Sequence, residues 1–249
     1  MIGFVETISR ARDMEKVWEH HQHEMARFGF NRLLYGFTTQ RTATSLGDPQ
    51  DWLVLTNHDP NYIGPFIESG MYFNAPMVRW ALENEGACSW GWMASQADAG
   101  RMSQAERRVY AFNKQNGIES GYTISFSGTS TRTKGGIALT AESGVPQSEV
   151  DAIWAEHGRE IVAMNTVVHL KLISMPYTGA RRKLTPRQRE ALEWVGDGKT
   201  MQDIAVIMGL TPATIEKHLR LARESLGVDT TAQAVLKAAF QNQIFVVEE

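Results

Sequence analysis

The chain has 249 residues and a formal net charge of −3 at pH 7, with 43% hydrophobic and 21% charged residues. This length suffices for two domains, and the composition is ordinary for a globular protein in water. The single cysteine, Cys88, excludes an intramolecular disulfide framework and cysteine-rich zinc ligation. No apolar run approaches the ~18 residues of a membrane helix, and MIGFVETISRARDMEK lacks the apolar core of a signal peptide, so we expect a cytoplasmic protein without membrane contact.

Helical and strand patterns alternate along the first 175 residues. Apolar positions from Thr7 to Phe28 keep helical spacing and predict one long amphipathic helix, and a second long helix is predicted from Pro146 to about Met175. The predicted strands are RLLYGFTT, DWLVLTN, ACSWGW, YTISFSG and GGIALTAE, and the predicted short helices are NYIGPFIES, APMVRWALENE and SQAERRVYAFNKQN. This order predicts an α/β domain over residues 1–173, an α/β/α sandwich whose sheet has about five strands.

Residues 174–182 combine proline, glycine and cations without periodicity, and we interpret them as a linker. An all-α domain is predicted over residues 183–249. Thr185 is the expected cap of its first helix, followed by Pro186 and by Gln188 at the capping-box position. Thr200 and Thr211 occupy the same place before two further helices.

The second and third of these helices have the features of a helix-turn-helix motif. Gly209 ends the second helix, and the apolar residues of the third recur at spacings of 3 and 4 and bury one face. Such a motif inserts the N-terminal end of its recognition helix into the major groove of DNA. The alternative interpretation is a helical bundle with solvated surface charges.

The outward-facing residues of the motif suit DNA. Arg220 can make a bidentate contact with guanine, and Lys217 is a donor to phosphate or base. The amides at Thr200 form a helix N-terminus that suits a phosphate beside Lys199. The candidate DNA-binding residues are Lys199, Thr200, Ala213, Thr214, Glu216, Lys217, His218 and Arg220.

Residues 184–245 resemble the C-terminal DNA-binding domain of LuxR-type quorum-sensing regulators. The residues that carry the resemblance are Leu184-Thr185-Pro186-Arg187, Leu192, Gly198-Lys199-Thr200, Ile204-Ala205, Thr214-Ile215-Glu216, His218-Leu219, Leu226-Gly227-Val228 and Ala232, Ala234 and Val235. The resemblance favours DNA binding over the plain bundle.

The segment of about residues 5–170 resembles the autoinducer-binding domain of quorum-sensing receptors. The stretches that carry this resemblance are YFNAPMVRWALE, CSW and NGIESGYTISFSG. The resemblance implies a pocket for an acyl-homoserine lactone between the sheet and one helical layer. Trp90 and Gly121 match the family, whereas Tyr62 replaces its tryptophan, Phe66 its tyrosine, and Ala75 the aspartate that accepts from the ligand amide.

The candidate ligand-binding residues are Tyr62, Phe66, Tyr72, Asn74, Ala75, Trp90 and Gly121. Asn74 is included because its carbonyl is the nearest substitute for the missing acceptor, although it lies one residue out of register. For Tyr62, Phe66, Tyr72, Trp90 and Trp92, pocket and core are open alternatives, whereas Trp18, Trp80 and Trp154 are expected in the core.

Catalytic and metal sites are not expected. His20 and His23 could share a helix face, but no third ligand has a fitting spacing. Cys88 lacks an evident histidine and acidic partner for a catalytic thiol. We therefore predict no catalytic residues, no metal and no cofactor beyond a possible acyl-homoserine lactone or other apolar signal.

These patterns indicate a transcription regulator of the LuxR quorum-sensing type that senses an apolar small molecule and binds a two-fold DNA operator as a homodimer. The stripe Thr231, Val235, Ala238 and Asn242 is the expected place of close helix contact between the two copies. Two alternatives remain. One is a ligand-independent regulator or dominant-negative partner of related receptors, and the other is an enzyme fused to a DNA-binding tail.

Overall fold

The computed structural model describes residues 1–42, 45–128 and 130–245, so the last four residues of the predicted second domain lie outside the described residues. The chain separates into two compact units. The first comprises Met1–Pro49 and Leu53–Ile173, and the second comprises Gln50–Trp52 and Ser174–Glu249.

Five antiparallel strands form one sheet in the first unit, in the order β2-β1-β5-β4-β3. Each overlaps a strand expected from the sequence. The strands are β1 (Phe30–Thr38), β2 (Leu53–Thr56), β3 (Gly86–Ser89), β4 (Gly121–Phe126) and β5 (Lys134–Ala141).

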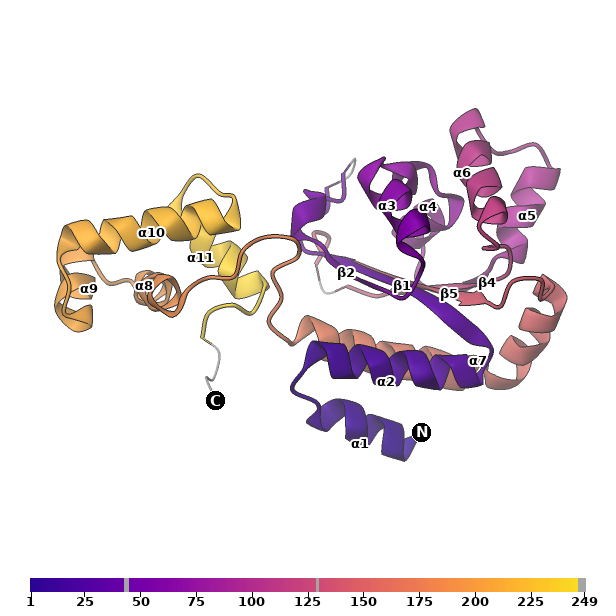
Figure 1. Cartoon of the computed structure of the whole chain (residues 1–249), viewed down its shortest axis with the longest axis horizontal. Helices are drawn as coiled ribbons and strands as arrows, with labels where there is room; N and C mark the ends of the chain where they lie inside the picture. The colour runs from indigo at the N-terminus through magenta and orange to yellow at the C-terminus, as the bar shows by residue number, and fades with distance from the viewer. Residues whose placement is uncertain (43–44, 129, 246–249) are drawn as a thin grey trace. The chain divides into compact units, whose positions relative to one another are not determined.

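Helices cover both faces of this sheet, which confirms the predicted α/β/α sandwich (Figure 1). One layer consists of α1 (Ile2–Arg10), α2 (Met14–Arg27) and α7 (Gln147–Ile173). The opposite layer consists of α3 (Pro60–Glu68), α4 (Pro76–Glu83), α5 (Gly91–Asp98) and α6 (Gln104–Gln115). Two 3₁₀ helices, η1 (Pro49–Asp51) and η2 (Met71–Asn74), lie in the connections.

Strand alternation separates the two faces of the sheet. Leu33, Tyr35 and Phe37 on β1 are buried, and the Tyr35 hydroxyl lies 2.9 Å from Nδ1 of His169 on α7. Since successive side chains of a strand point to opposite faces, Leu34 and Gly36 face α3–α6. The densely packed face is therefore the one beneath α2 and α7.

Two sequence-based boundaries in the first unit were wrong. The long helix expected from Thr7 is broken, because Ala11 is extended and Asp13 caps a new helix by accepting from the Glu15 amide at 2.8 Å. The expected strand ACSWGW ends at Ser89, and Trp90 begins α5, a helix that the sequence did not predict. In both places a local backbone turn outweighs the apolar pattern.

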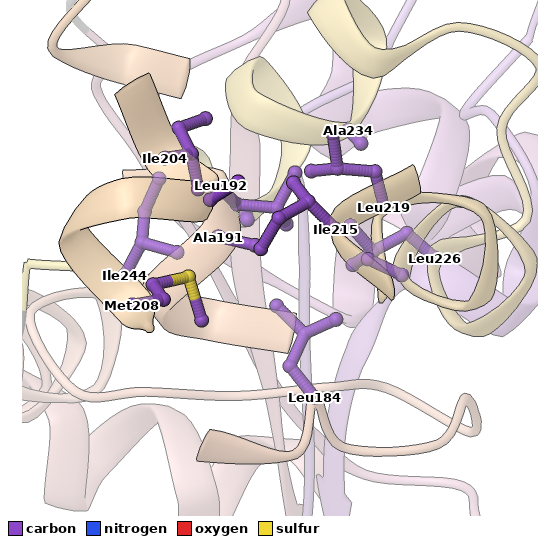
Figure 2. Packing of buried hydrophobic residues seen from close by; sticks show 13 residues of the cluster. Leu184, Ala191, Leu192, Ile204, Met208, Ile215, Leu219, Leu226, Ala234 and Ile244 are labelled. Carbon is purple, nitrogen blue, oxygen red and sulfur yellow. The ribbon is translucent and has the colours of Figure 1, made fainter. Parts of the chain in front are cut away.

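The second unit contains four helices, α8 (Pro186–Gly196), α9 (Met201–Met208), α10 (Pro212–Leu226) and α11 (Thr231–Phe240). Their apolar faces form one core. Figure 2 shows this core, in which Leu192 of α8, Ile204 of α9, and Ile215 and Leu219 of α10 are buried among their neighbours. Ile215 and Leu219 belong to the face of the third helix that the helical spacing assigned to the interior.

A threonine caps each of these four helices. Thr185, Thr200, Thr211 and Thr230 each accept from the backbone amide three residues later, at 3.2 to 3.4 Å. Gly209 ends α9 and Gly227 ends α10, both in the left-handed conformation that glycine adopts most readily. Each helix boundary is thus specified by contacts within a few residues.

Residues 174–182 do not lie open to solvent along their whole length. Met175 and Tyr177 are buried, and the Tyr177 amide donates to the Gln241 carbonyl at 3.0 Å. Part of the predicted linker therefore packs within the second unit.

Within the part of the chain that the structure describes, no helix has both the length and the apolar character needed to span a bilayer.

Candidate functional site

The central strands of the sheet leave open space on the side of α3–α6. Leu34 and Gly36 on β1 and Gly136 and Ala138 on β5 are only half-buried, although these strands lie inside the sheet. Gly36 pairs with Gly136, and a Cβ atom placed on Gly36 would meet no described residue within 4 Å apart from its chain neighbours. This face of β1 and β5 is therefore less tightly filled at its centre than the face beneath α2 and α7.

Aromatic residues predicted to bind the ligand are buried in the helical layer that faces this side of the sheet. Tyr62 stacks on Phe66 and on Phe112, each with ring centroids 5.5 Å apart, and its hydroxyl donates to Asn113 at 3.2 Å. Burial raises the pKa of the Tyr62 phenol above its usual range, so the group stays a neutral hydroxyl. Tyr72 is also buried and lies against the exposed Phe73.

Trp90 is buried at the start of α5. Its indole Nε1 donates to the Thr123 hydroxyl of β4 at 2.9 Å, so this donor already has a protein partner. Gly121 is needed beside it, because a Cβ atom there would overlap the Leu139 carbonyl oxygen and lie 3.1 Å from the Trp90 ring. These two positions thus depend on each other sterically.

The two residues considered for the amide acceptor behave differently. Ala75 is buried at the N-terminus of α4 and brings no polar side chain into the layer. Asn74 is exposed at the end of η2, so the structure does not place it among the buried residues.

Thr140 is a polar residue that the sequence analysis missed. Its side chain is 1% exposed, its hydroxyl has no hydrogen-bond partner among the described residues, and it pairs with Gly121 across β4 and β5. Alternation from buried Leu139 directs Thr140 to the face of α3–α6. The strict alternation in GGIALTAE was the signal that could have found it.

A polar cluster closes the sheet on the other face. The Asp151 carboxylate of α7 accepts from Ser89, Tyr122 and Gln147 at 2.8, 2.8 and 2.9 Å. Desolvation opposes ionisation, but the hydrogen bonds from Gln147, Tyr122 and Ser89 outweigh it and lower the Asp151 pKa. Since every partner is internal, this cluster positions β3, β4 and α7.

Metal ligation and thiol chemistry find no support in these side chains. Over residues 1–42, 45–128 and 130–245, no group of three His, Cys, Asp or Glu side chains could hold a metal ion. Burial raises the pKa of the Cys88 thiol, which disfavours the reactive thiolate.

The surface of α10 presents most of the predicted DNA-binding side chains. Ala213, Glu216, Lys217 and Arg220 are exposed, while Thr214 and His218 are half-buried. Arg220 forms an ion pair with Glu224 at 2.5 Å, and Glu216 pairs with Arg223 at 3.0 Å. Exposed pairs of this kind contribute only about 0–1 kcal/mol, so Arg220 can exchange Glu224 for a base.

Lys199 and Thr200 are exposed before α9, but the Thr200 amide is not free. It donates to the Asp203 carboxylate at 3.0 Å, and the Thr200 hydroxyl donates to the same carboxylate at 2.7 Å. The expectation of a free amide is therefore wrong for Thr200 itself, because the capping box uses that amide, and the phosphate contact at this helix N-terminus stays a prediction.

The predicted stripe on α11 was also wrong in part. Ala238 is fully buried in the core of its own unit, and Asn242 lies beyond the end of the helix. The large apolar side chains that α11 exposes are Leu236 and Phe240.

Comparison with known sequences identifies both units. The autoinducer binding domain family matches residues 13–172, and the family of sigma-70 region 4 matches residues 180–226. The transcriptional activator protein VanR of Vibrio anguillarum is 23% identical over 235 residues, covering 91% of this chain and 92% of VanR. The transcriptional activator protein LuxR of Aliivibrio fischeri is 20% identical, covering 78% and 76%.

Solved structures share the fold. SdiA of Escherichia coli superposes with a TM-score of 0.54 at 14% identity, covering 98% of both chains. CepR2 of Burkholderia cenocepacia, an N-acylhomoserine lactone dependent factor, gives 0.53 at 13%, covering 70% of this chain and 93% of CepR2. SdiA in complex with octanoyl-rac-glycerol also gives 0.53 at 13%, covering 99% and 96%.

These relatives regulate transcription, and the alternative of an enzyme with a DNA-binding tail is wrong. The two predicted resemblances, of residues 184–245 to the LuxR-type DNA-binding domain and of about residues 5–170 to the autoinducer-binding domain, are confirmed at the level of the family. The chain belongs to the LuxR-type quorum-sensing transcription regulators, whose autoinducer-binding domain precedes a helix-turn-helix domain.

Proposed function

We propose that the first unit binds an apolar signal that lacks an amide, and that the protein acts in the cytoplasm as a homodimer on a two-fold operator. The open space at Gly36 is the observation that carries the ligand proposal. It adjoins a layer rich in buried aromatic rings, which suits an acyl chain.

The polar groups of the site define the head of this signal. A ligand amide at Ala75 would find no side-chain acceptor, and a buried unpaired donor costs about 1–3 kcal/mol, or roughly ten- to a hundredfold in affinity. The Thr140 hydroxyl offers a donor and an acceptor without charge. An ester with free hydroxyls, such as the octanoyl-rac-glycerol seen with SdiA, matches this pattern better than an acyl-homoserine lactone.

The test compares octanoyl-rac-glycerol with N-octanoyl-homoserine lactone by thermal shift and calorimetry. We expect the wild-type protein to bind the glycerol ester more tightly, and Ala75→Asp to improve the lactone or to destabilise the fold through an unpaired charge. Asn74→Asp is the matched control, since it adds the same charge at an exposed neighbour. Nanomolar binding of the lactone by the wild type, without gain from Ala75→Asp, would contradict the proposal.

A ligand-independent regulator is the second candidate. Tyr62 is stacked on both sides, and the Trp90 indole already donates to Thr123, so these groups are satisfied by the protein itself. Native mass spectrometry of protein purified from its own host separates the two candidates. If the purified protein carries no small molecule and is fully dimeric, the result supports the ligand-independent regulator.

For DNA, we propose that α10 is the recognition helix and that Arg220 reads a base while Lys199 contacts phosphate. The exposed row on α10 and the weak pairing of Arg220 support this assignment. The exposed Leu236 and Phe240 of α11 are the proposed contact between two copies. Selection from random duplexes is expected to return two half-sites about 10 base pairs apart.

Arg220→Ala should weaken binding to a selected site by about 1–3 kcal/mol and leave binding to random duplex little changed. Lys199→Ala should weaken both DNAs alike, as the loss of a phosphate contact does. Fluorescence anisotropy at fixed salt measures both. Equal losses for Arg220→Ala on the two DNAs would remove Arg220 from base readout.

A further inference from the structure

A buried carboxylate holds two cations in the second unit. Asp51, in the segment Gln50–Trp52 of that unit, is 5% exposed. Its Oδ2 accepts from Nζ of Lys237 at 2.6 Å, and its Oδ1 accepts from Nε of Arg181 at 2.5 Å. Lys237 is itself 6% exposed, so this ion pair lies in the interior of the unit.

The two cations lie at the C-terminal ends of two helices, α11 and the proposed recognition helix α10. Lys237 lies in the last turn of α11. The Arg181 guanidinium lies against Gly227, the C-cap of α10, where a Cβ atom would overlap it. The C-terminal end of a helix carries partial negative charge and favours a cation. Asp51 therefore connects the C-terminal ends of α10 and α11 through one carboxylate.

The backbone reinforces this arrangement. The Ala180 amide donates to the Gln50 carbonyl at 3.0 Å. Gly179 has a φ of +58°, and a Cβ atom there would overlap the Gln50 carbonyl oxygen and lie 2.9 Å from that of Trp52. Residues 50–52 and 179–181 thus fit each other in main chain as well as in charge.

We propose that Asp51 is a positioning residue for DNA recognition, an internal counter-ion that fixes the C-terminal end of α10. Trp52 alone separates Asp51 from β2 along the chain. DNA binding then depends on residues 50–52 staying in place. The DNA part rests on the proposed role of α10, whereas the ion triad does not.

Hydrogen exchange of the full-length protein tests the triad without ligand or DNA. Asp51→Asn leaves Lys237 buried without a counter-charge, and we expect amides of α11 and of residues 177–182 to exchange at least about 100-fold faster. Trypsin should then cut faster after Arg181, Arg182 and Lys183. Asp48→Asn is the control, because it removes the same charge from an exposed neighbour.

A double variant identifies the cause. Lys237→Met removes the cation that needs Asp51, so Asp51→Asn with Lys237→Met should recover most of the protection lost in Asp51→Asn. A random-sequence duplex is the DNA probe, and we expect its affinity to fall at least tenfold with Asp51→Asn and to recover in the double variant.

Three results would overturn the proposal. They are exchange in Asp51→Asn that equals that of Asp48→Asn, no recovery in the double variant, and lost protection with unchanged affinity for the duplex. A wild-type protein that fails to bind any duplex would instead refute the proposed function, while the exchange data would still decide the triad.

Discussion

At the scale of single residues, the proposed ligand site depends on the absence of a side chain at Gly36. Apart from its two chain neighbours, no atom of the described residues lies within 4 Å of a Cβ placed there, and its backbone does not need the left-handed region that favours glycine. Gly36→Leu should therefore change the free energy of unfolding by less than about 1 kcal/mol, well below the usual cost of overpacking a filled core. The same variant should abolish binding of octanoyl-rac-glycerol, because its side chain would occupy the space proposed for the acyl chain. Urea unfolding and calorimetry check the two parts.

Gly121→Ala, on β4 of the same sheet, is the contrasting control. Its new methyl group would overlap the Leu139 carbonyl oxygen, so this smaller change should destabilise the protein more than Gly36→Leu does. If the order of the two is reversed, the centre of the sheet is filled and the space at Gly36 is not the ligand site.

Residue identity could predict part of this site. Tyr62, Phe66, Tyr72 and Trp90, for which the sequence left pocket and core as open alternatives, are all buried. Which ring stacks on which depends on contacts distant in sequence, such as that of Tyr62 with Phe112, and no local pattern encodes it. The exposure of Asn74 likewise follows from the turn of η2, which the apolar pattern does not show.

At the scale of elements, the threonine caps of α8–α11 give a measurable share of stability. Thr230 accepts from the Gln233 amide at 3.2 Å, while Gln233 accepts from the Thr230 amide at 3.1 Å. Thr230→Ala should lower the free energy of unfolding by about 1 kcal/mol, since it leaves a helix amide without its acceptor. Thr230→Ser keeps the hydroxyl and should retain most of that stability. If Thr230→Ala and Thr230→Ser have the same urea midpoint, the Thr230 hydroxyl contributes nothing to stability.

Elements whose ends are encoded locally were predicted best. The capping signals at Ser103, Thr185 and Thr200 each precede a helix in the structure. The N-terminal helices were joined in error because their apolar spacing continues across Ala11–Asp13, although Asp13 was itself a capping signal. Helix α5 was missed because CSWGW is apolar enough to be interpreted as a strand.

At the scale of the whole molecule, three buried histidines make stability depend on pH. Desolvation by burial lowers the pKa of His21, His58 and His169 to about 4 each. The folded state keeps them neutral, whereas the unfolded state takes up protons below pH 6.5. Stability is therefore constant above pH 6.5 with respect to these groups and falls between pH 6.5 and 4. The slope approaches about 1.4 kcal/mol per pH unit for each histidine.

Urea unfolding between pH 7.5 and 4.5 measures this slope. His21→Gln removes one titrating group while keeping a polar partner for Asn165, which lies 3.0 Å from Nε2 of His21, so its slope should be smaller than that of the wild type. His23→Gln is the control on the exposed side of α2. A wild-type slope that His21→Gln leaves unaltered would mean that His21 is already charged in the folded protein.

The division of the second unit into Gln50–Trp52 and Ser174–Glu249 has a consequence for biosynthesis. A ribosome releases residues 50–52 well before it translates α8–α11, and domains generally fold in the order of synthesis. The carboxylate of Asp51 is then already present when Lys237 emerges. A C-terminal fragment expressed alone never receives it, so such a fragment should accumulate poorly in cells, and a peptide of residues 48–54 supplied in trans is the corresponding rescue.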